Sequence, residues 1–182
     1  MTGKNVVLKN GSYSPRLRKK REDTVFRLVR ETDIKRLARL EAQIFPEELY
    51  GRDVLTARHF RHLLKRGNAL IVICERAGQL AAYAILLFKK NSDTARIYSI
   101  AVAQEQRGQR IAGRLMDEIE TLCAGVKAQA ITLETREDNA AMQALCDRSG
   151  FEVYHRMAQY YHDGQTAIKY KKSLGKGAKN HG

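Results

Sequence analysis

The sequence predicts one α/β domain with a mixed sheet, and three observations lead to this prediction. The chain has 182 residues, of which 43% are hydrophobic and 29% charged, as in ordinary globular domains that bury a core without disulfides or metals. Apolar residues alternate with polar ones in some segments and recur at helical spacing in others. The resulting order of elements is β-α-α-β-β-β-α-β-α-β-β, without an internal repeat, and such interleaving is typical of α/β proteins.

The first elements are a strand and two helices. Residues 24–30 alternate in polarity and are rich in β-branched side chains, which predicts a strand. A helix follows, with Thr32 as its N-cap and Pro46 at its end. A second helix begins near Asp53, whose carboxylate is a suitable cap, and ends at Gly67.

Three consecutive strands come next. The apolar segments 69–75 and 79–88 flank the turn residues Ala77 and Gly78, which predicts an antiparallel hairpin. After a polar turn, residues 95–103 form the third strand.

The rest of the chain alternates helices and strands. Ile111, Leu115, Ile119 and Leu122 lie at steps of four, four and three residues, which places them on one face of a helix. The remaining predicted elements are a strand over residues 130–135, a helix capped by Asp138 or Asn139 that stops at Gly150, and closing strands over residues 151–161 and 165–172.

The net charge of +13 is concentrated at the two ends of the chain. Residues 1–23 contain seven Lys and Arg residues and two acidic residues, and residues 168–182 contain five Lys residues and no acidic residue. We therefore expect a basic, flexible arm over residues 1–23, a folded domain over residues 24–172 and a flexible basic tail over residues 173–182. The arms suit a weak contact with a polyanion, although solvated charge is the simpler interpretation.

The cysteines and the apolar segments indicate the compartment. Cys74, Cys123 and Cys146 are odd in number, lie in periodic apolar segments and lack metal-ligand spacing, so we expect a reducing compartment and no metal site. The longest apolar run, residues 80–88, is far shorter than the roughly 20 residues of a membrane helix. We therefore predict a cytoplasmic protein without a membrane partner.

A short basic loop joins the strand 95–103 to the helix that begins at Ile111. Backbone N–H groups at a helix N-terminus point toward one position and bind anions. Arg107 and Arg110 add positive charge there, which suits a pyrophosphate. An arginine-rich turn is also common on ordinary surfaces, so the loop alone does not decide between the two interpretations.

A second candidate region surrounds Glu134. This carboxylate closes the strand 130–135 on its non-aliphatic face, where partial burial would raise its pKa toward that of a general base. A solvated glutamate at a strand end is the alternative. Asn139 and Cys146 are seven residues apart, so we expect them on the same face of the following helix.

Three segments carry a resemblance to a known family. They are IAVAQEQRGQRIA from Ile100, LETREDNAAMQALCDRSGFEV from Leu133 and YYHDGQTAIKY from Tyr160. In this order they resemble the GNAT superfamily of acetyl-CoA-dependent N-acetyltransferases over residues 24–172, and most closely its bacterial ribosomal-protein N-alpha-acetyltransferase branch. The resemblance implies a mostly antiparallel, seven-stranded mixed sheet flanked by four helices.

The resemblance also implies roles for individual residues. Glu134 would be the general base, Cys146 would occupy the position of the acid, and Tyr160 and Tyr161 would contact the acceptor. The strand at Ile100 would pair with pantetheine, and the following loop would hold the pyrophosphate. The cofactor-binding residues implied are Ile100, Ala101, Val102, Arg107, Gly108, Gln109, Arg110, Ile111, Ala112, Gly113 and Asn139.

Two positions depart from the family pattern. Arg110 replaces the middle glycine of the phosphate loop Q/R-x-x-G-x-G/A, a change that leaves the backbone donors in place. Cys146 replaces the tyrosine that protonates the leaving thiol in this branch. A thiol has an ordinary pKa of about 8.5 and is shorter than a tyrosine, but a leaving thiol of similar acidity needs little help. Tyr154, Tyr160 and Tyr161 are possible substitutes for the acid.

The sequence thus predicts an acetyl-CoA-dependent N-acetyltransferase that acts on a primary amine. A protein N-terminal α-amine is the leading acceptor, and a polyamine or amino sugar is the alternative within this class. The alternative from another class is a non-catalytic acyl-CoA-binding module or a module associated with the ribosome or RNA, based on Arg110, Cys146 and the basic arms.

Overall fold

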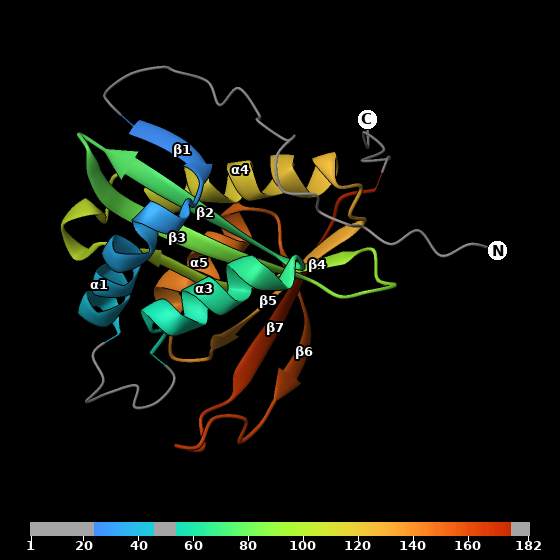
Figure 1. Ribbon diagram of the computed structural model, residues 1–182. Helices are drawn as coiled ribbons and strands as arrows, with labels where there is room; N and C mark the ends of the chain where they lie inside the picture. The colour runs from blue at the N-terminus through green and yellow to red at the C-terminus, as the bar shows by residue number, and fades with distance from the viewer. Residues whose placement is uncertain (1–23, 46–53, 176–182) are drawn as a thin grey trace.

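The computed structural model describes residues 24–45 and 54–175 (Figure 1). The strands are β1 (Thr24–Leu28), β2 (Ala69–Arg76), β3 (Gln79–Phe88), β4 (Thr94–Val102), β5 (Ala130–Arg136), β6 (Glu152–Met157) and β7 (Ala167–Ser173). The α-helices are α1 (Ile34–Ile44), α3 (Ala57–Arg66), α4 (Ile111–Gly125) and α5 (Ala140–Arg148). Two 3-10 turns, η1 (Glu31–Asp33) and η3 (Gln104–Gln106), precede α1 and α4.

The strands form one sheet of seven in the order β1-β2-β3-β4-β5-β7-β6. Every neighbouring pair is antiparallel except β4 and β5, which are parallel because α4 crosses between them. The mixed, mostly antiparallel sheet with four α-helices is therefore confirmed.

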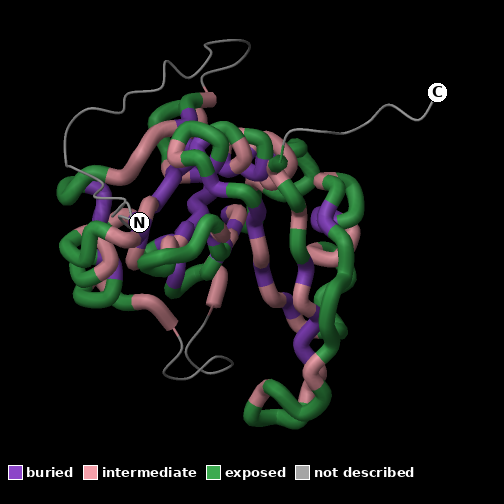
Figure 2. Tube along the Cα trace, turned by 90° about the vertical axis from the view of Figure 1, so that its right-hand side faces the viewer, coloured by how far each residue is buried: buried purple, intermediate pink, exposed green. Residues whose placement is uncertain are grey.

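The helices cover both faces of the sheet. One hydrophobic cluster joins α1 and α3 to Ile73, Tyr83 and Ile85, and the other joins α4 and α5 to Ala84 and Leu86. Successive residues of β3 thus point into different clusters, as a strand buried on both faces requires. Figure 1 shows the helices around the sheet, and Figure 2 shows that the buried residues concentrate in the interior of the domain.

The sheet opens at its centre, where β4 and β5 separate. The parallel pairing runs from Thr94 and Ala130 to Ile97 and Leu133 and then stops. The pairing of β4 with β3 shifts register between Ser99 and Ile97, so Tyr98 is an extra residue in β4. Such a bulge bends a strand and increases its twist. Beyond Ile97, the edge of β4 that faces β5 has no strand partner among the described residues.

Several element boundaries differ from those predicted. The second helix begins after Thr56, whose hydroxyl and the ring of His59 form a reciprocal cap; the predicted cap Asp53 lies outside the described residues. Thr32 does not cap α1, because it lies within η1, where the Asp33 carboxylate accepts from the Arg30 N–H. A local hydrogen bond between side chain and backbone therefore lies at each of these helix starts.

The closing strands are also shorter than predicted. The strand predicted over residues 151–161 ends at Met157, where pairing with Ala167 stops, and residues 158–166 form a loop. Gln159, with a φ of 52°, and Gly164, with a φ of 81°, have a left-handed backbone that a strand does not accommodate. Tyr160 and Tyr161 consequently lie on a loop.

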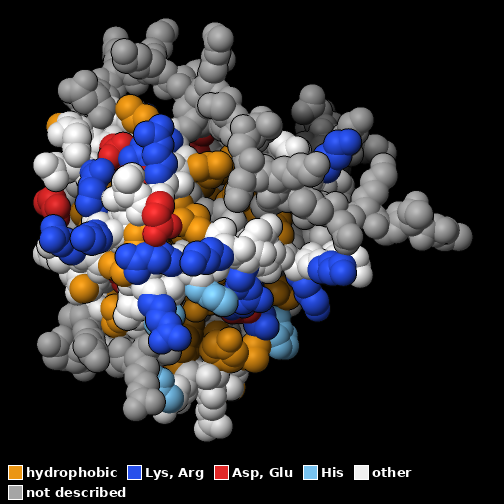
Figure 3. All heavy atoms as spheres, viewed as in Figure 1, with side chains coloured by type: hydrophobic (Ala, Val, Ile, Leu, Met, Phe, Trp, Pro, Cys, Tyr) orange, Lys and Arg blue, Asp and Glu red, His pale blue; other side chains and the backbone are white. Residues whose placement is uncertain are grey.

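The basic arm 1–23 and most of the tail 173–182 lie outside the described residues. The domain itself carries a basic surface over α1 and α3 (Figure 3). Among the exposed residues of this surface, Lys35, Arg39, Arg58, Lys65 and Arg66 have no ion pair within the described ranges. No helix in the described part of the chain is long and apolar enough to cross a membrane.

Candidate active site

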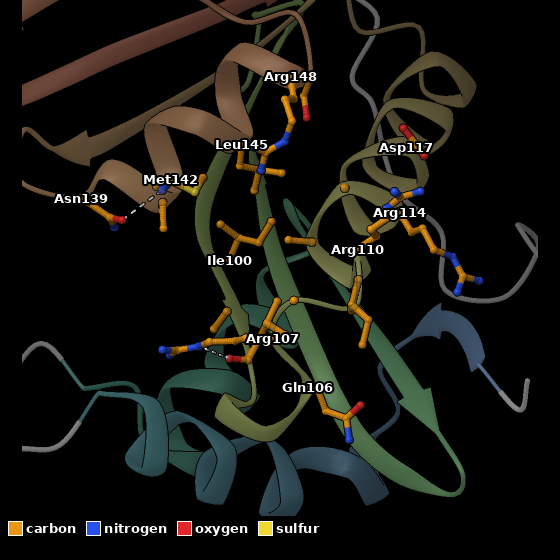
Figure 4. A pocket seen from close by; sticks show the side chains of 18 of the residues that line it. Ile100, Gln106, Arg107, Arg110, Arg114, Asp117, Asn139, Met142, Leu145 and Arg148 are labelled. Carbon is orange, nitrogen blue, oxygen red and sulfur yellow. Dashed lines mark hydrogen bonds between the residues drawn. The ribbon is translucent and has the colours of Figure 1, made fainter.

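Two adjoining clefts open where β4 and β5 separate. The cationic cleft, about 1280 Å³, lies between the start of α4 and α5. The carboxylate cleft, about 580 Å³, contains Glu41 and Glu134. The two share Phe45, Ile100, Asn139 and Met142, so they meet beside the middle of β4. Figure 4 shows Ile100 in the cationic cleft, between α4 and α5.

The backbone at the start of α4 supplies donors for an anion. Gly108 has a φ of 75° and Arg110 has a φ of 59°, so the loop makes two left-handed steps before the helix. No side chain caps α4, and the N–H groups of Ile111, Ala112 and Gly113 precede the first intrahelical donor, Arg114. Three N–H groups and the positive end of a 15-residue helix therefore face one position.

Cationic side chains surround these donors. The cleft is lined by Arg107, Arg110, Arg114, Arg148 and Lys172, against the acidic Asp117 and Glu120. Arg107 is positioned by the bond from its Nε to the carbonyl oxygen of Val102, at 3.4 Å. Lys172 pairs with Glu120 at 2.6 Å, so the positive charge on the arginines remains in excess. This electrostatic environment suits a phosphorylated ligand.

Asn139 caps α5 with its side-chain oxygen, which leaves its side-chain amide nitrogen as a donor for a ligand. Its Oδ1 accepts a hydrogen bond from the Met142 N–H at 3.0 Å (Figure 4), so Asn139 is the N-cap of α5. Of the two predicted caps, Asp138 and Asn139, the second is therefore correct. The amide nitrogen makes no hydrogen bond within the described residues. Asn139 lines both clefts and can therefore donate to a ligand at their junction.

The structure brings together ten of the eleven predicted cofactor-binding residues. They line the cationic cleft: Ile100, Ala101, Val102, Arg107, Gly108, Arg110, Ile111, Ala112, Gly113 and Asn139. Gln109 does not line it, because its side-chain amide donates to the carbonyl oxygen of Glu105 at 3.3 Å. These residues fit a coenzyme A group, since unpaired backbone donors and arginines suit the pyrophosphate, and the open edge of β4 suits an amide-bearing arm.

Glu134 lies in the carboxylate cleft with two cationic partners. Its carboxylate forms ion pairs with Arg96 of β4 and, at 3.4 Å, with Lys169 of β7. The side chain is 18% exposed, so it is partly buried as predicted. Arg96 thus connects the two strands on one side of the opening, and Lys169 holds Glu134 from the other.

Tyr160 and Tyr161 border the same cleft from the loop between β6 and β7. Their rings meet edge to face, with centroids 5.1 Å apart, and the guanidinium of Arg136 lies 5.1 Å from the Tyr161 ring. Burial raises the pKa of Tyr161. The loop therefore places one half-buried and one exposed tyrosine beside Glu134.

The prediction that Cys146 faces the site is wrong. Its side chain is fully buried in the core between α5 and the sheet, and it lines neither cleft. Burial raises the pKa of this thiol to about 12. Asn139 and Cys146 do not share a face either, because Asn139 precedes the helix as its cap. All three cysteines are buried free thiols.

Glu41, which was not predicted as a site residue, is 3% exposed and lines the carboxylate cleft from α1. A signal was present, because Glu41 follows Leu37 at four residues and therefore lies on the apolar face of the helix. Arg96, the partner of Glu134, was also missed. No group of three or more potential metal ligands occurs in the described part of the chain.

The acetyltransferase (GNAT) family model matches residues 34–151. The chain belongs to the GNAT acetyltransferase family. Its fold is similar to that of the ribosomal-protein-S18-alanine N-acetyltransferase from Escherichia coli, with a TM-score of 0.73 and 21% identity over 86% of this chain and 97% of that one. A similar match is Ard1 from Thermoplasma volcanium, with a TM-score of 0.69 and 21% identity over 83% and 97%.

Two curated relatives also resemble this GNAT chain in sequence. N-alpha-acetyltransferase 30 of Schizosaccharomyces pombe is 38% identical over 74 residues, which are 41% of this chain and 49% of that protein. The catalytic subunit NAA10 of the N-terminal acetyltransferase A complex of Arabidopsis thaliana is 28% identical over 124 residues, which are 66% and 64%. The chain thus spans about half of the first relative and less than two thirds of the second.

Proposed function

We propose that this GNAT protein transfers an acetyl group from acetyl-CoA to a primary amine, with a protein N-terminal α-amine as the leading acceptor. The meeting of the two clefts at Ile100 and Asn139 carries the proposal. A pyrophosphate-bearing donor bound in the cationic cleft would then lie next to a carboxylate that can accept a proton. The two relatives named as N-terminal acetyltransferases support the α-amine.

The cationic cleft would hold acetyl-CoA. The N–H groups of residues 111–113 and the side chains of Arg107 and Arg110 would bind its pyrophosphate, and the open edge of β4 would pair with its amide-bearing arm. When bound, acetyl-CoA supplies an acetyl group activated as a thioester, whose thiol leaves without an acid because its acidity is near that of free cysteine. No role for Cys146 is required.

Glu134 would remove the proton from the incoming ammonium group through a water molecule, since an amine attacks only with a free electron pair. Arg96 and Lys169 would keep its carboxylate aimed across the cleft. Backbone N–H groups of β4 beyond Ile97 would stabilise the negative charge that develops on the acetyl carbonyl oxygen. Tyr160 and Tyr161 would contact the acceptor.

A screen for thiol release over N-terminal peptides and small amines tests the activity. We expect turnover on at least one peptide, and Glu134→Gln should lower kcat by about 100-fold or more at neutral pH while leaving acetyl-CoA binding unchanged. Glu137→Gln removes an exposed carboxylate that pairs with Arg156 outside both clefts and serves as the control. Full activity of Glu134→Gln would show that another group is the base.

The second candidate function is non-catalytic acyl-CoA binding combined with a polyanion contact. The basic surface over α1 and α3 favours the contact, together with the charged arms. Binding of RNA that weakens steeply with salt, and that falls when residues 1–23 are deleted or when Arg58 and Lys65 become Glu, would support it. Acetyl-CoA binding without turnover on any amine would favour this function over catalysis. The cytoplasmic location remains a prediction.

A further inference from the structure

The two glutamates of the carboxylate cleft have opposite electrostatic surroundings. Glu134 has the cationic partners Arg96 and Lys169. Glu41, at 3% exposure, accepts hydrogen bonds from two neutral donors among the described residues: the hydroxyl of Tyr83 and, at 3.1 Å, the backbone N–H of Leu55. No ion pair to Glu41 occurs within the described ranges.

One of the two donors to Glu41, the hydroxyl of Tyr83, comes from the core. Tyr83 is fully buried on β3, and its hydroxyl also lies 3.2 Å from Oγ of Ser99 on β4. Phe60 packs edge to face against the Tyr83 ring at 5.9 Å. The carboxylate is therefore held in one orientation at the wall of the cleft, and burial raises its pKa. A buried carboxylate without a counter-charge is costly, and a cation that enters beside it lowers that cost.

A cation at Glu41 must belong to a part of the acceptor that does not react. The attacking nitrogen is neutral when it forms the new bond, so it cannot at the same time compensate the charge of Glu41. The reacting amine and the compensating cation are consequently two groups of one molecule, one near Glu134 and the other near Glu41.

We propose that Glu41 is a cation subsite of the carboxylate cleft and selects acceptors that carry a second positive charge besides the reacting amine. This inference rests on the proposed function. Two sources share the required chemistry: a small diamine, and a peptide with a basic side chain near its N-terminus. Glu41 is here a specificity-determining residue, and the proton transfer stays with Glu134.

Matched acceptors test the subsite. We expect the wild-type KM to be lower by about tenfold for 1,5-diaminopentane than for pentylamine, or for an Ala-Lys peptide than for its Ala-norleucine analogue, because hydrogen bonds to charged groups are the strong ones. The pair that shows the difference identifies the source. Glu41→Gln keeps the volume and removes the charge: its oxygen can accept from the Leu55 N–H, and its amide can donate to the Tyr83 hydroxyl. It should abolish the discrimination, and the loss should appear in KM rather than in kcat.

Glu118→Gln is the matched control. Glu118 is a partly buried carboxylate of α4 whose pKa is also raised by burial, but it lines neither cleft. It should leave the discrimination intact. An unchanged KM ratio in folded Glu41→Gln would overturn the proposal. Equal KM values for both members of each acceptor pair in the wild type would also overturn it, and that measurement does not require the variant to fold.

A binding experiment separates the two proposals. Titration of the full chain with 1,5-diaminopentane and with the Ala-Lys peptide, followed by calorimetry, needs no turnover. If the wild type binds the diamine or the peptide, Glu41→Gln does not, and no amine is acetylated, the subsite is retained and the proposed function is rejected. Acetylation without preference for a second charge would retain the function and reject the subsite.

Discussion

Ile97 and Leu133 are the last two residues through which the parallel strands β4 and β5 pair. Beyond them the strands separate, and the extra residue Tyr98 bends β4 away. Both clefts depend on this separation, because continued pairing would occupy the edge of β4 and close the space between α4 and α5. The position at which two strands stop pairing therefore creates the site.

Arg110→Gly should stabilise the fold and weaken donor binding. Arg110 has a φ of 59°, a left-handed conformation that costs a residue with a side chain about 1–2 kcal/mol relative to glycine. Urea unfolding should show a gain of about 1 kcal/mol, and calorimetry should show acetyl-CoA affinity lower by up to about fivefold, because an exposed cation is lost. Arg107→Gly is the control, because Arg107 has a φ of −68° and glycine at this position relieves no backbone strain. A less stable Arg110→Gly would contradict this explanation.

Asn139→Asp should separate the capping role of this residue from its role in the cleft. Asp is as good an N-cap as Asn, so the free energy of unfolding should be retained, whereas Asn139→Ala should lose about 1 kcal/mol. Acetyl-CoA binding should weaken in both variants, and more in Asn139→Asp, which adds negative charge at the junction of the clefts. Equal acetyl-CoA affinity in the wild type and in Asn139→Asp would mean that the amide donates nothing to the donor.

Cys146→Ala should leave catalysis intact. The thiol is fully buried and lines neither cleft, so kcat should stay within about twofold of the wild type. The small cavity should lower the free energy of unfolding by about 1 kcal/mol. Cys146→Tyr places a large ring in the same closed site and should destabilise the fold by overpacking. A large fall in kcat for well-folded Cys146→Ala would restore the thiol as a participant.

Because Asp33 is paired with Arg27, the free energy of unfolding should fall at acidic pH. The carboxylate is 4% exposed and accepts from Arg27 at 2.6 and 2.9 Å, and this bond holds the pKa of Asp33 below its ordinary value. Because the folded-state pKa is lower than the unfolded value of about 4, the stabilisation is present above about pH 4 and is lost as the pH falls through the folded-state pKa.

Asp33→Asn tests this dependence. It should cost about 2 kcal/mol at pH 7, since the guanidinium of Arg27 loses the charge of Asp33 and keeps only the carboxylate of Glu75, and the difference from the wild type should shrink in acid. Urea unfolding at pH 7 and pH 3 measures both values. Glu152→Gln, which removes an exposed carboxylate of β6, should show no change at either pH. A difference that is equal at both pH values would exclude the charge of Asp33 as the cause.

Much of the fold was predictable because periodicity reports burial directly. The hairpin over β2 and β3, the helix from Ile111 and the strand at Glu134 were placed within a few residues. The helix starts expected at Asp53 and Thr32 were less accurate, because several neighbouring polar side chains can accept a local hydrogen bond and the sequence does not rank them. The strand end expected at Tyr161 was less accurate, because the residue at which a strand stops pairing depends on its partner strand. The basic loop before α4 was predictable as a candidate anion site because such a site rests on the backbone at a helix N-terminus, which is local.

The order of elements, the family resemblance and the basic loop before α4 could be predicted from the sequence, because each is encoded in a contiguous segment. Which side chains share a cleft became known from the folded chain. There Cys146 lies in the core, Glu134 pairs with Arg96 and Lys169, and Glu41 lies beside Tyr83, 42 residues away. Electrostatic surroundings depend on contacts across the sheet, and one sequence does not display those contacts.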